Sequence, residues 1–452
     1  MTILPDCIQR AERARLFPIL AETSKEGRTL SIFLATLAAV REFRTNLLRE
    51  IGRRVGPAAT LRTYTEAEFK CAKGEPNLGR PDGLLVLDTW GSRWTALVEA
   101  KVGKVEISAE QLERYLDLAK RNKIDAVITI SNQFSAIPQH HPLRVNMTKY
   151  RGVDLFHFSW MHVLTEAELL TVNRDVEDDD QAFILNEFRR FISHESAGVQ
   201  SFTQMPAAWP EVVGKVQAGG VLQRTADVGA VAEAWIEESR DLCLLLSRQL
   251  KRSVSQRLTR AATADPAARC QEDVNTLCTE QCLRAVLSVP EAAAPMEVRV
   301  DLQRRSVMVS MKLRAPTDRV SSRARLSWLL RQIPEGSDQN IHVRCLWPAT
   351  SPNTQFRLGD LREDPERIQQ SKGKLAVTGF EILWLADLGR KFEQRRTFIE
   401  ELQRAVPAFY ESVGQHLRAW QPPPPKIPEE RSQVSDVSPA AISEDSDTTS
   451  LE

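Results

Sequence analysis

The stretch GRPDGLLVLDTWGSRWTALVEAKVG, residues 79–103, decides how the fold of this chain is interpreted. It contains two apolar runs, LLVLD and TALVEAKV, which have the composition and length of β-strands and are separated by a turn. Asp82 enters the first run, and Glu99 and Lys101 end the second. A charge in an apolar run is unfavourable unless it is paired or binds a metal. The three charged residues therefore indicate a site rather than a plain core.

Further strands and helices are predicted on both sides of this stretch. Alternating β-branched and aromatic residues predict a strand over 61–70, and a continuous apolar run predicts a buried strand over 125–131. Helical spacing without a breaker predicts a helix over 31–51. Ser108 and Gln111 form an S-x-x-Q capping box, which begins a second helix.

The resulting order is helix, three strands, helix, strand, with the strands at 61–70, 84–88, 95–102 and 125–131. Two strands joined through a helix imply a right-handed parallel crossover, whereas short links imply hairpins. The predicted fold class is therefore α/β, with a mixed sheet flanked by helices. A strand over 152–160 and a helix over 178–194, capped by its acidic start, close a first domain over residues 1–200.

The chemistry of such a site follows from the alternation of side chains along a strand. Glu99 and Lys101 point to the same side, and Ala100 points away with its carbonyl oxygen available as a ligand. If the two strands are neighbours, Asp82 meets them. Magnesium prefers oxygen ligands and commonly uses one or two carboxylates. A lysine beside it can position water, stabilise charge or act as a base.

These residues resemble the PD-(D/E)XK nuclease superfamily over roughly residues 30–135. The resemblance implies a restriction-endonuclease-like core in which Asp82 and Glu99 bind Mg²⁺ or Mn²⁺, with the Ala100 carbonyl as a further ligand. It implies that Lys101 is the catalytic lysine. Gln111 and Tyr115 match the Q-x-x-x-Y signature of the RecB-like branch, where these residues support the site or contact DNA.

Each of these residues also has a simpler interpretation. Glu99 and Lys101 could form an ion pair at a sheet edge, Gln111 could serve only the helix cap, and Tyr115 could pack in the core. An E-x-K triplet alone is weakly specific, because the chain has another one, Glu68–Lys70. The strand and helix context around the second triplet carries the interpretation.

The resemblance also implies one more acidic ligand, supplied by the first helix or strand. Glu50 ends the predicted helix, while Glu66 and Glu68 share one face of the predicted strand 61–70. We favour Glu66, because its strand is expected to run beside the strand that Asp82 opens. His140 and His141 precede a proline and are interpreted as part of a solvated turn.

The rest of the chain resembles no family. Residues 205–290 are predicted as a helical region and 291–420 as a C-terminal α+β domain of unknown role. Residues 421–452 form a Pro-rich, acidic tail that is predicted to be disordered. Cys270, Cys278 and Cys282 suggest zinc, but no four-ligand set is complete, so we interpret them as one helix face.

The composition is that of an ordinary soluble protein, with 42% hydrophobic and 27% charged residues and no net charge. Residues 1–160 carry 24 Lys and Arg against 18 Asp and Glu, which is compatible with a polyanionic partner. The sequence contains no recognisable signal peptide or membrane span, and its cysteines need not pair, so we expect a cytoplasmic protein.

The sequence therefore predicts a metal-dependent nuclease that hydrolyses phosphodiester bonds in nucleic acid, with DNA as the favoured substrate. It is an Mg²⁺-dependent phosphodiesterase in this interpretation, and a homodimer is possible. One alternative is a silent nuclease-fold module that binds nucleic acid or a protein partner without cutting. Another is a scaffold in which the predicted helix 228–258 oligomerises.

Overall fold

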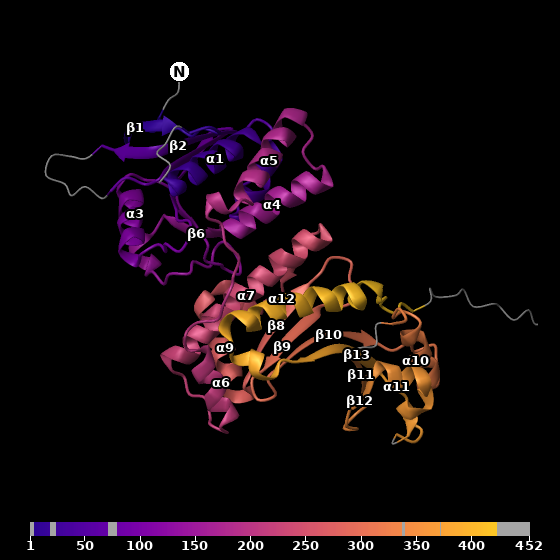
Figure 1. Ribbon diagram of the computed structural model, residues 1–452. Helices are drawn as coiled ribbons and strands as arrows, with labels where there is room; N and C mark the ends of the chain where they lie inside the picture. The colour runs from indigo at the N-terminus through magenta and orange to yellow at the C-terminus, as the bar shows by residue number, and fades with distance from the viewer. Residues whose placement is uncertain (1–3, 19–23, 71–78, 337–339, 371, 423–452) are drawn as a thin grey trace, which may run out of the picture.

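The computed structural model of the protein describes residues 4–18, 24–70, 79–336, 340–370 and 372–422. The chain folds around two β-sheets, one at the top of Figure 1 and one at the bottom. Most of the predicted tail lies outside the described residues, as does part of the loop that Gly, Pro and Asn residues predict over 74–81. Within the described residues no helix is long and apolar enough to cross a membrane.

The first sheet has six strands in chain order: β1 (Ile8–Arg13), β2 (Thr60–Phe69), β3 (Gly83–Thr89), β4 (Ser92–Ala100), β5 (Ala126–Ser131) and β6 (Asp154–Ser159). Strands β1 to β4 are antiparallel, and β4, β5 and β6 are parallel. The predicted mixed sheet and the parallel crossover from β4 to β5 are confirmed. Strand β1 was not predicted, because its alternation is masked by charged residues that remain exposed.

Helices cover both faces of this sheet (Figure 1). One core contains the apolar sides of α1 (Lys25–Ala39), α2 (Arg41–Glu50), α4 (Trp160–Asn173) and α5 (Asp179–Ile192). The other core contains the apolar side of α3 (Ala109–Arg121). Asp178 caps α5 through the Gln181 amide, as its position predicted, whereas α4 was not predicted.

The predicted continuous helix over 31–51 is wrong at Val40, where α1 ends and α2 begins. Val40 is fully buried and extended, with φ −96° and ψ 113°. The bend brings Phe33 of α1 and Phe43 of α2 into edge-to-face contact, with ring centroids 6.2 Å apart. Both rings also contact Phe188 of α5. Tertiary packing therefore breaks a helix in which the sequence contains no breaker.

The second sheet has seven antiparallel strands in the order β12-β11-β13-β10-β9-β8-β7. They are β7 (Ser255–Gln256), β8 (Cys282–Ser288), β9 (Met296–Asp301), β10 (Ser306–Arg314), β11 (Ile341–Leu346), β12 (Thr354–Arg357) and β13 (Gly379–Asp387). Alternation in the sequence predicts a hairpin over 296–313 and strands over 340–348 and 375–386. The β9–β10 pair confirms the hairpin, and β11 and β13 confirm the two strands.

Helices pack on this second sheet and share one core with it, which runs from Met205 to Leu417. They are α6 (Trp209–Gln217), α7 (Ala226–Leu250), α9 (Pro266–Glu280), α10 (Ser322–Leu330), α11 (Leu358–Glu363) and α12 (Arg395–Ser412), while the short helix α8 (Arg260–Ala264) contacts α9. Figure 1 shows α12 lying along the sheet.

The prediction that residues 205–290 are helical is wrong for their last part, because β8 pairs with β9 there. Helix α9 ends at Glu280, and Gln281 adopts a left-handed conformation that starts the strand. Cys278 and Cys282 therefore lie on a helix and a strand rather than on one helix face.

Helix α7 joins the two parts of the molecule. Its Glu237 carboxylate accepts a hydrogen bond from the Phe134 amide at 2.9 Å, and Asp241 accepts one from Phe202 at 2.9 Å. Leu244 belongs to the core of the first part, whereas Trp235 belongs to the core of the second. The apolar sides of the predicted oligomerising helix are thus buried within the chain.

Gly83, the first residue of β3, lies where the core leaves no room for a side chain. A Cβ at this position would lie 2.8 Å from Leu34 Cδ1 and 3.2 Å from Val98 Cβ. We expect Gly83→Ala to lower the free energy of unfolding by about 1–3 kcal/mol through overpacking. Gly214→Ala in helix α6 is the control, because a Cβ there meets nothing within 4 Å.

Urea denaturation measures both free energies of unfolding. In the helical control, alanine is expected to be neutral or stabilising by up to about 1 kcal/mol. Equal stability of Gly83→Ala and the wild type would show that this part of the core is loosely packed.

Candidate metal centre

The antiparallel pairing of β3 and β4 brings the start of one strand to the end of the other. Gly83 pairs with Val98, so Asp82, one residue earlier, lies opposite Glu99. The Ala100 amide donates a hydrogen bond to Asp82 Oδ2 at 3.1 Å. The structure thereby brings Asp82 and Glu99 together where β3 begins and β4 ends, in the middle of the sheet, and the register of the two strands fixes their separation.

Lys101 follows β4 directly and lies at the centre of this cluster. Its backbone amide donates to Ile130 of β5 at 2.8 Å, which holds it to the sheet beyond the last strand residue. Its ammonium donates to Glu99 Oε1 at 2.6 Å and to the Ala100 carbonyl at 3.1 Å, and lies 3.9 Å from Asp82 Oδ2. The predicted trio of charged side chains is therefore in mutual contact.

A third carboxylate comes from Glu26, in the first turn of α1. The N-cap residue of this helix, Ser24, forms no side-chain capping hydrogen bond. Glu26 Oε1 accepts from the Lys101 ammonium at 2.8 Å. Glu26, Asp82 and Glu99 each offer a carboxylate oxygen, and these atoms lie within 4.8 Å of one another. Sequence analysis missed Glu26, because the helix was predicted to begin only at residue 31.

The structure does not bring Glu66, the acidic residue that we favoured, into this cluster. Glu66 has a left-handed backbone conformation, with φ 53°, at an irregularity in the β1–β2 pairing. Such a bulge re-aims a side chain. The Glu66 carboxylate forms an ion pair with Arg80 instead, and Glu68 also contacts Arg80, at 3.0 Å.

Gln111 and Tyr115 both reach the cluster from α3, which packs on one face of the sheet. The Gln111 amide hydrogen-bonds to the Ser108 hydroxyl at 3.1 Å, as in a capping box, but the Gln111 side chain donates to Glu99 Oε1 at 2.5 Å. Ser108 therefore caps the Gln111 backbone, whereas the Gln111 side chain contacts Glu99 in the cluster, which is the site role that the sequence suggested. Tyr115 packs in the core, and its hydroxyl donates to the Arg80 carbonyl at 3.3 Å.

The electrostatics of the cluster favour a bound cation. Glu99 is 1% exposed, and its Oε2 is buried without a hydrogen-bond partner in the part of the chain that the structure describes. Burial and the neighbouring Glu99 raise the pKa of Asp82 to about 8. Burial disfavours the charge of Lys101, but hydrogen bonds to Glu26 and Glu99 outweigh it and raise its pKa.

This donor set fits Mg²⁺ or Mn²⁺. Three carboxylates from α1, β3 and β4 face one ammonium, and hard divalent cations select oxygen ligands of this kind. The unpartnered Oε2 of Glu99 is a free ligand position. The Ala100 carbonyl, which the sequence also suggested, contacts the Lys101 ammonium in this arrangement.

Glu50, another acidic candidate, belongs to a second cluster with His162 and Glu166. His162 Nε2 donates to Glu50 at 2.9 Å, and Arg240 of α7 donates to His162 Nδ1 at 2.8 Å. Both ring nitrogens are thus engaged in protein contacts that join α2, α4 and α7. We interpret this cluster as a structural link between the two parts of the molecule.

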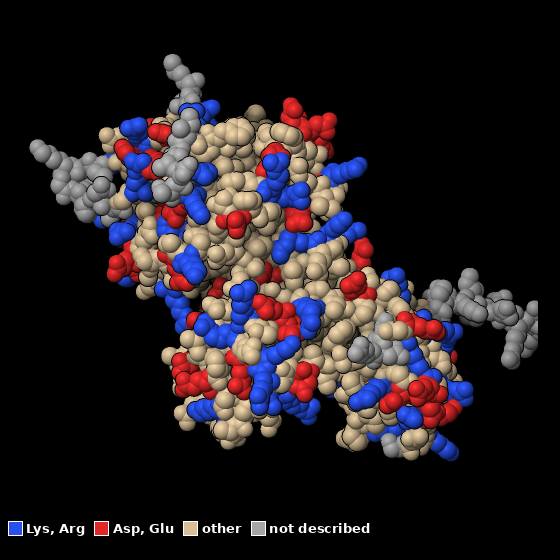
Figure 2. Space-filling model, viewed as in Figure 1, with Lys and Arg blue, Asp and Glu red and all other residues tan. Residues whose placement is uncertain are grey.

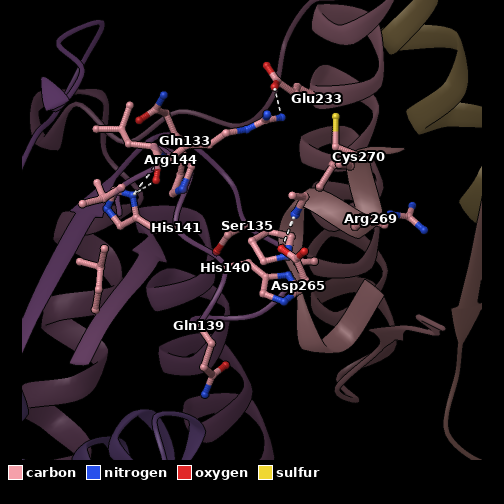
Figure 3. A pocket seen from close by; sticks show the side chains of 18 of the residues that line it. Gln133, Ser135, Gln139, His140, His141, Arg144, Glu233, Asp265, Arg269 and Cys270 are labelled. Atoms are coloured by element: carbon pink, nitrogen blue, oxygen red, sulfur yellow. Dashed lines mark hydrogen bonds and ion pairs between the residues drawn. The ribbon is translucent and has the colours of Figure 1, made fainter. Parts of the chain in front are cut away.

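A cavity of about 800 Å³, separate from the carboxylate cluster, lies between the loop 133–145 and helices α7 to α9 (Figure 3). Our interpretation of His140 as solvated is wrong, because it is 5% exposed and bonds to the Thr263 carbonyl at 3.0 Å. His141 bonds to Thr129 at 2.8 Å. Burial and the neighbouring His157 lower the pKa of His141 to about 3, so its ring is neutral.

Comparison with family models, curated proteins and solved structures found no match for this chain. The site is therefore assigned from its own geometry. Of the residues that the sequence predicted, Asp82, Glu99, Ala100 and Lys101 come together, and Gln111 and Tyr115 join them from α3. Glu66 does not, and Glu26 lies where the additional carboxylate was expected.

The metal ligands can be tested by thermal unfolding with Mg²⁺ or Mn²⁺. A ligand at about a hundredfold excess over its Kd stabilises a protein by about 2.7 kcal/mol, which raises Tm by roughly 5–10 °C. We expect Glu26→Gln to weaken this response by about tenfold or more in metal concentration, because a ligand is lost. Glu66→Gln should retain the wild-type response, and the reverse pattern would restore Glu66 as the ligand.

The raised pKa of Asp82 predicts how stability depends on pH without metal. The folded protein keeps this proton up to about pH 8, whereas the unfolded chain releases it near pH 3.8. The free energy of unfolding of the wild type therefore decreases as the pH rises from about 4 to about 8. Asp82→Asn removes that loss and can still accept from the Ala100 amide. We expect it to raise the free energy of unfolding by on the order of 2 kcal/mol near pH 8, and not near pH 4.

Asp88→Asn is the control for this measurement, because Asp88 lies at the other end of β3. It is paired with Arg62 and Arg93, so its substitution should destabilise rather than stabilise. Denaturant titrations in EDTA at several pH values give the free energies. A stability of Asp82→Asn that follows the wild type at every pH would contradict the raised pKa.

Proposed function

We propose that this protein is a metal-dependent nuclease that hydrolyses phosphodiester bonds, with DNA as its substrate. The proposal depends on one observation: four charged side chains meet where β3 begins and β4 ends. They are Glu26, Asp82, Glu99 and Lys101. Three carboxylates with one ammonium are a suitable set for holding Mg²⁺ or Mn²⁺ beside a phosphate.

The order of elements supports the resemblance to the PD-(D/E)XK superfamily. Helices α1 and α2 are followed by β2, β3 and β4, then by α3 and β5, which is the helix, three strands, helix and strand of that core. The acidic residues lie at the start of β3 and the end of β4, as the family's motif requires. A restriction-endonuclease-like core is therefore part of the proposal.

In this proposal Glu26, Asp82 and Glu99 hold the metal ion, with the Ala100 carbonyl as a further oxygen donor. When bound, Mg²⁺ or Mn²⁺ supplies charge stabilisation at the phosphate and lowers the pKa of a bound water. Gln111 keeps the Glu99 carboxylate in place from α3, through the hydrogen bond at 2.5 Å. The residues thus come from elements whose packing fixes them before substrate binds.

Lys101 acts as a hydrogen-bond donor rather than as a base. Its pKa is raised by its hydrogen bonds to Glu26 and Glu99, despite the opposing effect of burial, so the ammonium keeps its proton at neutral pH. A protonated lysine can orient the attacking water and stabilise the negative charge that develops on the phosphate. Of the roles that the sequence left open for Lys101, this one agrees with its surroundings.

A silent module that only binds nucleic acid or protein is the alternative. The cluster favours catalysis, because Asp82, Glu99 and Lys101 are all present and in contact, and Glu26 adds a further carboxylate. Binding alone needs no buried carboxylate with an unpartnered oxygen such as Glu99 Oε2. A cleavage assay separates the two functions.

We expect Mg²⁺- and Mn²⁺-dependent cleavage of DNA that EDTA abolishes, measured on supercoiled, linear duplex and single-stranded substrates. Glu99→Gln and Lys101→Ala should each lower the rate by at least about a hundredfold, because they remove a ligand and the charge-stabilising donor. Glu68→Gln is the matched control. It alters the other E-x-K triplet, whose glutamate pairs with Arg80, and should cleave like the wild type.

Equal rates for the wild type and Glu99→Gln would rule out the proposed catalytic role. Binding of DNA in EDTA and in Mg²⁺ without cleavage in either would support the silent module instead. Unfolding midpoints of each variant identify losses of activity that come from misfolding.

A further inference from the structure

A groove of about 330 Å³ is lined in part by Asp82, one of the carboxylates of the candidate metal centre. Three segments form it, namely the end of β1 with the residues after it, the start of α1, and the middle of β2. The residues that matter for its chemistry are Arg13, Arg15, Ser31, Glu66 and Asp82.

The backbone of Arg15 is fixed at this groove by a buried serine. Ser31 of α1 is 4% exposed, and its hydroxyl accepts from the Arg15 amide at 2.9 Å and donates to the Arg15 carbonyl at 3.0 Å. The preceding residue, Ala14, donates to the Thr63 carbonyl of β2 at 3.2 Å. Arg15 is thus held between a helix and a strand, although it lies outside β1.

The Arg15 side chain is exposed, and it forms no ion pair with any residue that the structure describes. The acidic residues around the groove are engaged elsewhere. Glu66 is neutralised by Arg80, and Glu12 lies 3.6 Å from Arg10. The remaining carboxylate, Asp82, belongs to the metal centre. The bulge that turns Glu66 towards Arg80 therefore leaves the positive charge of Arg15 available in the groove.

Charge on the visible face of the molecule is mixed rather than gathered in one patch. Figure 2 shows Lys and Arg interspersed with Asp and Glu over this face of the molecule. Basic side chains that are paired with neighbouring carboxylates attract a polyanion weakly. Binding of nucleic acid would then depend on unpaired cations near the site, and Arg15 is such a cation.

We propose that this groove is a subsite for one nucleotide of a single strand, and that Arg15, with Arg13 beside it, binds the phosphate next to the scissile one. The inference rests on the proposed function, because the scissile phosphate is taken to lie at Asp82 and Glu99. An arginine forms charge-assisted, bidentate hydrogen bonds with a phosphate.

The size of the groove selects a single strand. Its volume lies at the lower end of the range for small-molecule pockets, about 300–1,000 Å³, which suits one nucleotide. A protein that holds duplex DNA buries about 1,000–2,500 Å² of its own surface, so a duplex would have to be held mainly by surface outside this groove. The subsite therefore favours single-stranded DNA or a frayed end over a blunt duplex.

The test is equilibrium binding of fluorescently labelled single-stranded DNA in EDTA, measured by anisotropy at several salt concentrations. We expect Arg15→Ala to weaken binding about tenfold and to lower the slope of log K against log salt by about 0.7, the value for one phosphate contact on a single strand. Arg15→Lys should keep the slope, because it keeps the charge. Arg121→Ala is the matched control, since Arg121 is an exposed arginine in the last turn of α3 that does not line the groove and forms no ion pair with any described residue.

Wild-type affinity and salt slope in Arg15→Ala would overturn the subsite. An equal loss on blunt duplex DNA would overturn its assignment to a single strand. These measurements need no turnover, so failure of the proposed nuclease function would be seen separately, as absence of cleavage by the wild type. Under cleavage conditions, a subsite predicts a raised KM for Arg15→Ala with little change in kcat.

Discussion

The contact between Glu99 and Lys101 at the end of β4, 2.6 Å long, is the interaction on which the rest of the site depends. Glu99 is 1% exposed, and a carboxylate buried to this degree requires a compensating charge. Lys101 supplies this charge. It also donates a hydrogen bond to Glu26, which connects the start of α1 to the end of β4. Gln111 binds the same Glu99 carboxylate from α3. One buried ion pair therefore draws together helices from two different cores.

This arrangement leaves the cluster with more negative charge than one ammonium offsets. Burial, together with the neighbouring Glu99, raises the pKa of Asp82, and one buried oxygen of Glu99 has no hydrogen-bond partner among the residues that the structure describes. A divalent cation would relieve both, which links the electrostatics of the folded chain to its proposed function. The bulge at Glu66 limits the negative charge of the cluster, because it directs the Glu66 carboxylate to Arg80 instead of to the other carboxylates.

Local sequence patterns predicted most elements of the first sheet and the core of the site. Strand alternation gave Glu99 and Lys101 a common side, and the capping signal at Ser108 located α3. The errors occurred where distant contacts override local preference. The predicted single helix is interrupted at Val40, where the bend brings Phe33 and Phe43 into contact. Residues after α9 form the strand β8, which pairs with β9, instead of continuing the helix.

Local patterns were enough to predict strands β2 to β6, the charged residues at the ends of β3 and β4, and the common side of Glu99 and Lys101, since these depend on the two-residue period of a single strand. The packing of distant elements selects the further carboxylate that joins them. Glu26 lies 75 residues before Lys101, and no local period relates the two. Glu66 does not reach the cluster, because a β-bulge and an ion pair with Arg80 hold its carboxylate elsewhere. The two-residue period of a strand predicts neither feature. Packing between elements, rather than any pattern within one, completed the site.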